Sequence, residues 1–393
     1  MNPTAHRPPA VPYWLWPWCA FLFLVPFKQL IPGGPFITLE VFAAALLALA
    51  PRRGASLANG RFLAVSALFL MLALSYFFSL YPDETKMPLL RIGMAYVTFV
   101  LAASVALAPD ELTAALKSWF YGGVAAAGAL LSFGSGGVSG RASMAVGDYA
   151  AEPNFFIAEL VLPFAIGCWL AGKPGDRWLA LPGLGVILGA TLFTQSRGGL
   201  IALLVVVAAL LVMARRWRTL VFSAALGLTL LTAFAPHLGR YDVTADPTGS
   251  QRTVIWEVVL PEAFARWPTG IGLNATRFHT TTLPGLYEEK SAHNTYVQAF
   301  VETGLFGLLA LLAVMVAHLR LRGESAWVRP MKAGLWGLAV AAVFLHMLGI
   351  QALWIPWIVA AQVAASRPPR ALARSAAPLP APPVRQALPP RAS

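Results

Sequence analysis

Apolar residues occur along this chain in long blocks that short polar segments separate. The blocks are about 16 to 22 residues long, the length of helix that crosses a hydrocarbon core of roughly 30 Å. We therefore predict an all-α polytopic membrane protein with about twelve transmembrane helices. The predicted spans are residues 13–31, 36–50, 62–80, 89–107, 112–131, 154–172, 178–193, 199–213, 219–235, 294–317, 332–348 and 350–365.

The longest polar segment, residues 236–292, lies between the ninth and tenth predicted spans. Four of its residues recur at the spacing of one helix face: Arg252, Ile255, Trp256 and Val259. This spacing predicts an amphipathic helix on the outer membrane surface, with Ser250 as a candidate N-cap. The segment is too short to hold a core of its own. We therefore expect one integral membrane domain, residues 1–366, over which this segment forms a lid.

Composition supports the membrane prediction. Hydrophobic residues make up 58% of the chain and charged residues only 12%, whereas soluble proteins carry roughly a quarter charged residues. Cys19 and Cys168 both lie inside apolar blocks and are too few for a disulfide framework. Pro, Ala and Arg dominate residues 367–393, which we expect to form a disordered cytoplasmic tail that touches anionic lipid head groups.

The net charge of +12 indicates membrane topology rather than nucleic acid binding, because no stripe of basic and aromatic residues is present in the sequence. Lys and Arg gather instead in alternate loops: Arg52, Arg53 and Arg61; Lys173 and Arg177; Arg215, Arg216 and Arg218; and Arg320, Arg322, Arg329 and Lys332. Short loops rich in Lys and Arg stay in the cytoplasm, so both termini are predicted to be cytoplasmic. The outer face then carries the remaining loops: 81–86, 132–153, 194–198 and 236–292.

Arginines on the predicted outer face need an explanation, because the charge bias of membrane proteins makes them uncommon there. Arg197 follows Ser196 and precedes two glycines, at the point where a predicted helix begins. Glycines let the backbone approach a ligand closely, and a helix N-terminus adds partial positive charge. A guanidinium group also matches phosphate in a bidentate manner. Arg197 and Ser196 are therefore candidate anion ligands; the alternative is a snorkelling arginine in a tight turn.

Three further arginines are open to two interpretations each. Arg252 and Trp256, one helical turn apart, either bind substrate or anchor their helix at the membrane interface. Arg91, near the outer end of the fourth span, either binds substrate or forms a snorkelling or ion-paired group. Arg141 either binds substrate or pairs with Asp148 in the Gly-rich loop.

His293 and Asn294 begin the tenth predicted span on the same outer face, and Asn294 is a further candidate for substrate binding. A neutral imidazole accepts a proton near pH 7, so His293 is a candidate general base; the alternative is a capping or incidental histidine. Glu302 falls on the opposite side of this helix and about 13 Å deeper, so we interpret it as a structural residue with an internal partner. Gly304 and Gly307 fit close helix packing. The sequence contains no HxxxH, HExxH or cysteine pair, and we expect no metal and no other cofactor.

The stretch HNTYVQAFVETGLFG resembles the signature of the O-antigen ligase/polymerase superfamily, a His-Asn pair followed by E-x-G-x-x-G in an apolar helix. Three further features occur in the superfamily's order. A Pro-Asn pair begins the sixth span, SRGG follows the seventh, and R-x-x-x-W followed by P-x-G-I-G lies in the long outer loop. The resemblance covers residues 130–320; the first four spans match only in layout.

The resemblance implies a helical membrane glycosyltransferase of GT-C-like architecture, which takes a glycan from undecaprenyl diphosphate at the periplasmic face of a Gram-negative inner membrane. His293 matches the superfamily's essential histidine, and Arg197 and Arg252 match arginines proposed to hold the diphosphate. Among its activities, we expect O-antigen ligation to lipid A-core, without metal and with inversion. Polymerisation of O-antigen or exopolysaccharide by the same chemistry is the alternative. A lipid-linked sugar flippase or exporter is the alternative from another class of protein.

Overall fold

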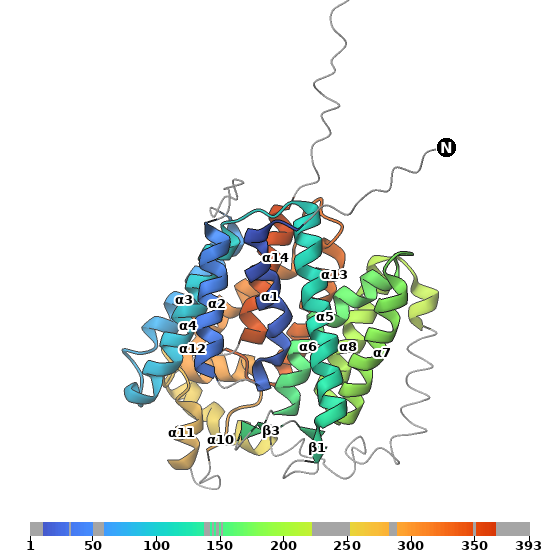
Figure 1. Ribbon diagram of the computed structural model, residues 1–393. Coiled ribbons are helices and arrows are strands. Elements are labelled where there is room, and N and C mark those ends of the chain that lie inside the picture. The colour runs from blue at the N-terminus through green and yellow to red at the C-terminus, as the bar shows by residue number, and fades with distance from the viewer. Residues whose placement is uncertain are drawn as a thin grey trace, which may run out of the picture.

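The computed structural model describes residues 11–30, 33–49, 59–136, 142–143, 145–146, 149–150, 152–221, 252–282, 289–348 and 351–366. These residues form helices that stand side by side in one bundle, which confirms the predicted all-α class (Figure 1). The α-helices are α1 (Trp16–Leu24), α2 (Gly33–Ala48), α3 (Gly60–Leu74), α4 (Pro82–Ala103), α5 (Pro109–Phe133), α6 (Pro153–Ala171), α7 (Arg177–Phe193), α8 (Arg197–Met213), α10 (Arg252–Ala265), α11 (Thr276–His279), α12 (Thr295–Leu319), α13 (Val328–Phe344) and α14 (Gln351–Ala365). Short 3-10 helices are η1 (Tyr13–Leu15) and η2 (Val25–Leu30) around α1, and η5 (Thr280–Thr282) after α11.

Every predicted span corresponds to one of these helices, apart from 219–235, most of which lies outside the described residues. Three helices, α4, α6 and α12, are long and apolar enough to cross a membrane. Shorter apolar helices are Phe36–Ala48, Gly60–Leu74, Arg177–Phe193, Arg197–Met213 and Ala352–Ala365. The number of helices that cross a membrane, and the likeness to GT-C enzymes, stay predictions.

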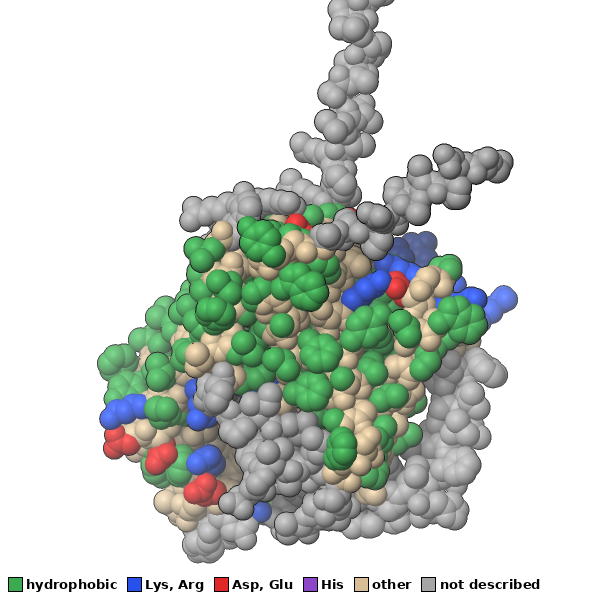
Figure 2. All heavy atoms as spheres, in the orientation of Figure 1, with side chains coloured by type: hydrophobic (Ala, Val, Ile, Leu, Met, Phe, Trp, Pro, Cys, Tyr) green, Lys and Arg blue, Asp and Glu red, His purple; other side chains and the backbone are tan. Residues whose placement is uncertain are grey.

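Large apolar side chains point outward from the bundle. Leu63 is 65% exposed, Leu204 56% and Phe306 54%, although each belongs to an apolar helix. Figure 2 shows the same pattern: apolar side chains cover the middle of the visible face, and charged side chains gather toward its ends. Soluble monomers rarely expose apolar surface on this scale. The exterior is therefore suited to lipid.

The connection between α3 and α4 differs from the prediction at both ends. α3 ends at Leu74 rather than at residue 80, and α4 begins at Pro82 rather than at residue 89. Pro82 and the two acidic residues after it favour a helix start, because Pro fits the first turn and acids complement the helix dipole. Between the helices, the backbone N–H of Leu80 donates to the carbonyl of Ile271 at 2.8 Å. This turn thus supports the segment that follows α10.

The eleventh predicted span ends too late in the chain. α13 stops at Phe344, and Leu345 is extended with φ −138° and ψ 157°. The hydroxyl of Thr295, at the start of α12, donates to the carbonyl of Leu345 at 2.7 Å and accepts the N–H of Met347 at 3.0 Å. These bonds take the place of helical hydrogen bonds. They hold the break between α13 and α14 against the N-terminus of α12.

The amphipathic helix predicted in the long polar segment is present as α10. It packs on α12 through Ile255, Val259 and Ala263, which form a small core with Val301. Ser250, the predicted N-cap, lies outside the described residues. The role of residues 236–292 as a lid stays a prediction.

α12 bends at Gly304, which has φ 66° and ψ −169°. The segment after α10 fits into this bend, where the N–H of Leu305 donates to the carbonyl of Trp267 at 2.7 Å. A Cβ atom on Gly304 would lie 2.4 Å from the carbonyl oxygen of Pro268. Gly304 therefore permits the close approach of a connecting segment, whereas the sequence analysis assigned it to helix–helix packing.

One end of the bundle carries α10, α11 and two short antiparallel hairpins, and we call it the outer end (Figure 1). The hairpins pair β1 (Ser135–Gly136) with β2 (Ala142–Ser143) and β3 (Ala145–Val146) with β4 (Tyr149–Ala150). α6 and α8 begin at this end, so their first residues lie beside the start of α10. The outer end therefore gathers residues that are far apart in the sequence.

Candidate active site

Three helices begin around the end of α13. Arg252, the first residue of α10, donates from Nη2 to the carbonyl of Phe344 at 3.2 Å, and its guanidinium carbon lies 5.7 Å from the centre of that ring. Gly198, the second residue of α8, lies so close that a Cβ atom would be 2.7 Å from Cβ of Phe344. Thr295, the first residue of α12, bonds to Leu345. The N-termini of α8, α10 and α12 thus converge, and their partial positive charges add there.

Arg197 is held by the capping of α8. The buried Ser196 hydroxyl accepts the N–H of Gly199 at 3.1 Å and donates to Oδ1 of Asn154 at 2.8 Å. Asn154 in turn donates to a carboxylate oxygen of Glu152 at 2.8 Å. The start of α8 is therefore fixed to the start of α6, and the half-buried Arg197 is the next residue after the cap. These contacts assign the Ser196 hydroxyl to helix capping.

His293 lies immediately before α12 in an uncommon backbone conformation. Its φ is 48°, in the left-handed region that residues other than glycine rarely adopt. The cap of α12 is Asn294, whose Oδ1 accepts the N–H groups of Tyr296 at 2.9 Å and Val297 at 3.1 Å. The alternative that His293 caps this helix is therefore wrong.

The surroundings of His293 favour its neutral form. Burial is the main cause that lowers the pKa of His293 to about 4, and the nearby charges of Arg252 and Lys290 lower it further. The imidazole is therefore uncharged near pH 7. A neutral ring beside an arginine is able to accept a proton, as a general base must.

A chain of buried hydrogen bonds holds the residue before His293. The carbonyl of Ala292 accepts the indole N–H of Trp256 at 2.7 Å, and its own N–H donates to Oε1 of Gln298 at 2.8 Å. The Gln298 amide donates to a carboxylate oxygen of Glu302 one turn further along α12. Both backbone groups of Ala292 are therefore fixed by side chains. Of these side chains, Trp256 reaches the carbonyl of Ala292 from α10.

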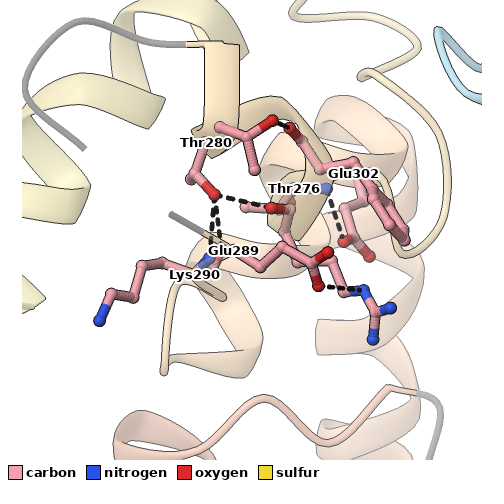
Figure 3. A network of polar contacts seen from close by, with 8 residues as sticks. Thr276, Thr280, Glu289, Lys290 and Glu302 are labelled. Atoms are coloured by element: carbon pink, nitrogen blue, oxygen red, sulfur yellow. Dashed lines mark hydrogen bonds and ion pairs between the residues drawn. The ribbon is translucent and has the colours of Figure 1, made fainter. Parts of the chain in front are cut away.

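Glu302 has the internal partners that the sequence analysis expected. Its buried carboxylate also accepts the backbone N–H of Thr276 at 3.3 Å. Figure 3 shows this contact beside a second group of bonds, in which the Thr280 hydroxyl donates to the carbonyl of Arg277 and bonds to both backbone groups of Lys290. Glu289 lies 3.6 Å from Arg277 in the same group. Glu302 therefore holds the start of α11, and Thr280 holds the segment that follows it.

Two predicted site residues do not join this cluster. Arg91 is exposed on α4, and its charge acts on the half-buried Lys28. Among the described residues, no hydrogen bond or ion pair links it to His293 or to the other two arginines. Arg141 and its predicted partner Asp148 lie outside the described residues. The structure thus brings Arg252 close to His293 and places the start of α8, which bears Arg197, against Phe344, the residue that Arg252 contacts.

Gln298, Thr295 and Phe344 contribute to this site but were not predicted from the sequence. Gln298 lies one turn before Glu302, and a polar pair at that spacing in an apolar helix is a signal that was present in the sequence. Phe344 contributes a backbone carbonyl and an aromatic ring to the contact with Arg252, and no sequence pattern distinguishes it from an ordinary apolar residue.

The charges around His293 indicate the kind of ligand that fits. The groups that act on it are the cations Arg252 and Lys290, together with the N-termini of three helices. In the described part of the chain, no three His, Cys, Asp or Glu side chains gather in one place. The cluster is therefore suited to an anion.

The fold and this cluster define a helical protein with an apolar exterior and a cationic, histidine-containing site at one end of its bundle. Residues 182–312, a third of the chain, match the family model described as O-antigen ligase. This segment includes Arg197, Arg252 and His293, and it is similar to a domain that ligases and polymerases share. No curated protein matches the chain.

Proposed function

We propose that the protein is an O-antigen ligase, which transfers a glycan from undecaprenyl diphosphate to lipid A-core. The observation that carries the proposal is that the start of α8, which bears Arg197, and the guanidinium group of Arg252 both lie at Phe344, and that the charge of Arg252 acts on His293. The family match over residues 182–312 supports it independently.

The chemistry needs two kinds of group. The bond between the anomeric carbon of the glycan and the diphosphate oxygen breaks, and its electron pair leaves with undecaprenyl diphosphate. An acceptor hydroxyl forms the new bond to the same carbon and loses its proton. Arg197, Arg252 and the converging helix N-termini would neutralise the leaving diphosphate. His293 would take the proton. Direct displacement of this kind inverts the anomeric centre.

The low pKa of free His293 is consistent with this role. A base with a pKa of about 4 is weak, but a bound diphosphate would offset the positive charges that lower the value. The donor would thereby raise the basicity of His293 at the moment when the acceptor must be deprotonated. Substrate binding and base strength would be coupled.

We place the protein in the inner membrane of a Gram-negative bacterium, with both termini in the cytoplasm and the outer end in the periplasm. The basic loops at the opposite end from α10 support this orientation. Figure 2 shows Lys and Arg side chains beside the upper ends of α7 and α8, away from the outer end. Both substrates are lipid-anchored, so they would enter sideways from the membrane.

The test is a transfer assay with purified protein in detergent. It contains lipid-linked glycan, with either lipid A-core or no acceptor, after exhaustive treatment with a chelator. Glycan attached to lipid A-core in the chelated sample is the expected result. Glycan chains that lengthen without lipid A-core would identify a polymerase instead. Loss of activity on chelation that a divalent metal restores would contradict the metal-free mechanism.

A further inference from the structure

The break between α13 and α14 places a second histidine against the site. Leu345 and Met347 both bond to the hydroxyl of Thr295, and the carbonyl of Phe344 accepts from Arg252. His346 lies between these anchored residues. Its backbone is therefore held at the N-terminus of α12, close to His293.

The His346 side chain packs against Phe155 and is only partly exposed. Its ring meets the ring of Phe155 edge to face, with centres 5.6 Å apart. Nδ1 is buried and has no hydrogen-bond partner among the residues that the structure describes, while the residue as a whole is partly exposed. With the proton on Nε2, no N–H is buried at Nδ1 without an acceptor. We therefore assign the proton to Nε2, the ring nitrogen that is not enclosed without a partner.

The charges near His346 favour an anionic ligand. Burial is the main cause that lowers the pKa of His346 to about 4, and its electrostatic neighbours are His293 and Arg277. The ring is therefore neutral near pH 7 and offers one N–H donor. A neutral donor among cationic groups suits an oxygen that carries negative charge.

We propose that His346 donates its Nε2–H to a phosphate oxygen of the donor lipid's diphosphate, beside Arg252. The identity of the ligand rests on the proposed function; the position of the donor group rests on the break between α13 and α14. His346 lies outside the segment that matches the O-antigen ligase family, which ends at residue 312. The diphosphate site would thus include a residue from the last pair of helices.

Three variants separate hydrogen bonding from packing. His346→Gln keeps an N–H donor near the position of Nε2, whereas His346→Asn carries its amide near the buried position of Nδ1. His346→Phe keeps the aromatic contact with Phe155 and removes both nitrogens. As a matched control, His318→Phe makes the same change at a buried histidine near the other end of α12, where the ring bonds to the carbonyl of Val314 and stacks on Trp357.

The measurement is binding of undecaprenyl diphosphate to the full-length protein in detergent, together with the donor KM and kcat. We expect His346→Phe and His346→Asn to weaken binding at least tenfold and to raise donor KM, with kcat changed less than threefold. His346→Gln should stay within about threefold of wild type, the range expected when a hydrogen bond to a charged group is kept. His318→Phe should bind as wild type does.

A second measurement does not depend on turnover. In protein labelled at the histidine rings, NMR should show the His346 pKa rising when undecaprenyl diphosphate binds, because the bound anion favours the charged ring. If His346→Phe is folded and binds like wild type, the inference is overturned while the proposed function stands. If wild-type protein neither binds undecaprenyl diphosphate nor transfers glycan, both are overturned.

Discussion

The side-chain oxygen of Gln298 accepts the backbone N–H of Ala292 at 2.8 Å, and its amide donates to Glu302. Gln298 therefore connects a buried carboxylate to the residue that precedes His293. Because His293 has an uncommon positive φ, its position depends on neighbours that fix the backbone on each side. Asn294 does this on the helix side by capping α12.

Gln298→Leu should therefore misplace the base without removing it. We expect kcat to fall about 10- to 100-fold, since a displacement of the order of 1 Å has effects of that size, and donor KM to change little. Glu302→Gln keeps an oxygen that can accept from Gln298 and Thr276, so it should retain most activity. A Gln298→Leu protein with wild-type kcat would show that Ala292 does not position His293.

His293→Asn tests the base with the backbone preserved, because Asn tolerates the left-handed conformation better than most residues. We expect this variant to melt close to wild type and to lose about 100- to 10,000-fold in transfer rate, the usual contribution of a general base. His293→Val should lose activity equally but also stability, since a β-branched residue is strained at φ 48°. Wild-type transfer by the Asn variant would remove His293 from the mechanism.

Arg252→Lys keeps the charge and removes the planar group that bonds to Phe344 and matches phosphate. We expect donor KM to rise at least about tenfold, because a bidentate contact is lost. Arg197→Lys should behave in the same way. Arg91→Lys serves as the comparison, since Arg91 lies apart from this cluster, and its donor KM should match wild type. Equal donor KM values for all three variants would contradict recognition of diphosphate by Arg197 and Arg252.

Ser196→Ala removes the N-cap of α8 and the bond to Asn154. Loss of a cap costs about 0.5–2 kcal/mol, so thermal unfolding should begin at a lower temperature. Ser196→Thr retains the hydroxyl and should keep most of this stability. Unfolding of Ser196→Ala at the wild-type temperature would mean that another group satisfies the N-terminus of α8.

The pH dependence follows from the low pKa of His293. The acidic limb of kcat/KM reports the free enzyme and should lie near pH 4, well below the ordinary histidine value of 6.5. Lys290→Gln removes one cation and should move this limb to higher pH, though only part of the way, because burial is the main cause of the low pKa.

The same low pKa affects stability. Between pH 6.5 and 4, His293 takes up a proton in the unfolded chain but not in the folded protein. The contribution of His293 to the free energy of unfolding is therefore full above pH 6.5 and is lost as the pH falls toward 4. His293→Asn should weaken this pH dependence of stability.

Hydrophobic patterning determined the helices of this protein, because an apolar block of sufficient length has few other ways to satisfy its backbone. The motifs also identified Arg197, Arg252 and His293 as residues with chemistry. The ends of the helices were predicted less accurately. α3 and α13 end earlier than predicted because the turns that follow them bond to distant residues, Ile271 and Thr295 respectively. Such partners cannot be read from local spacing.

Only the tertiary structure decided how these residues meet. Glu302 is on the wrong side of α12 to touch His293, yet Gln298 and Ala292 connect them through side-chain and backbone bonds. Phe344 and His346 reach the site because α13 breaks where Thr295 and Arg252 bond to its end. A sequence pattern records the periodicity of one helix, whereas these contacts depend on the packing of several helix ends against one another.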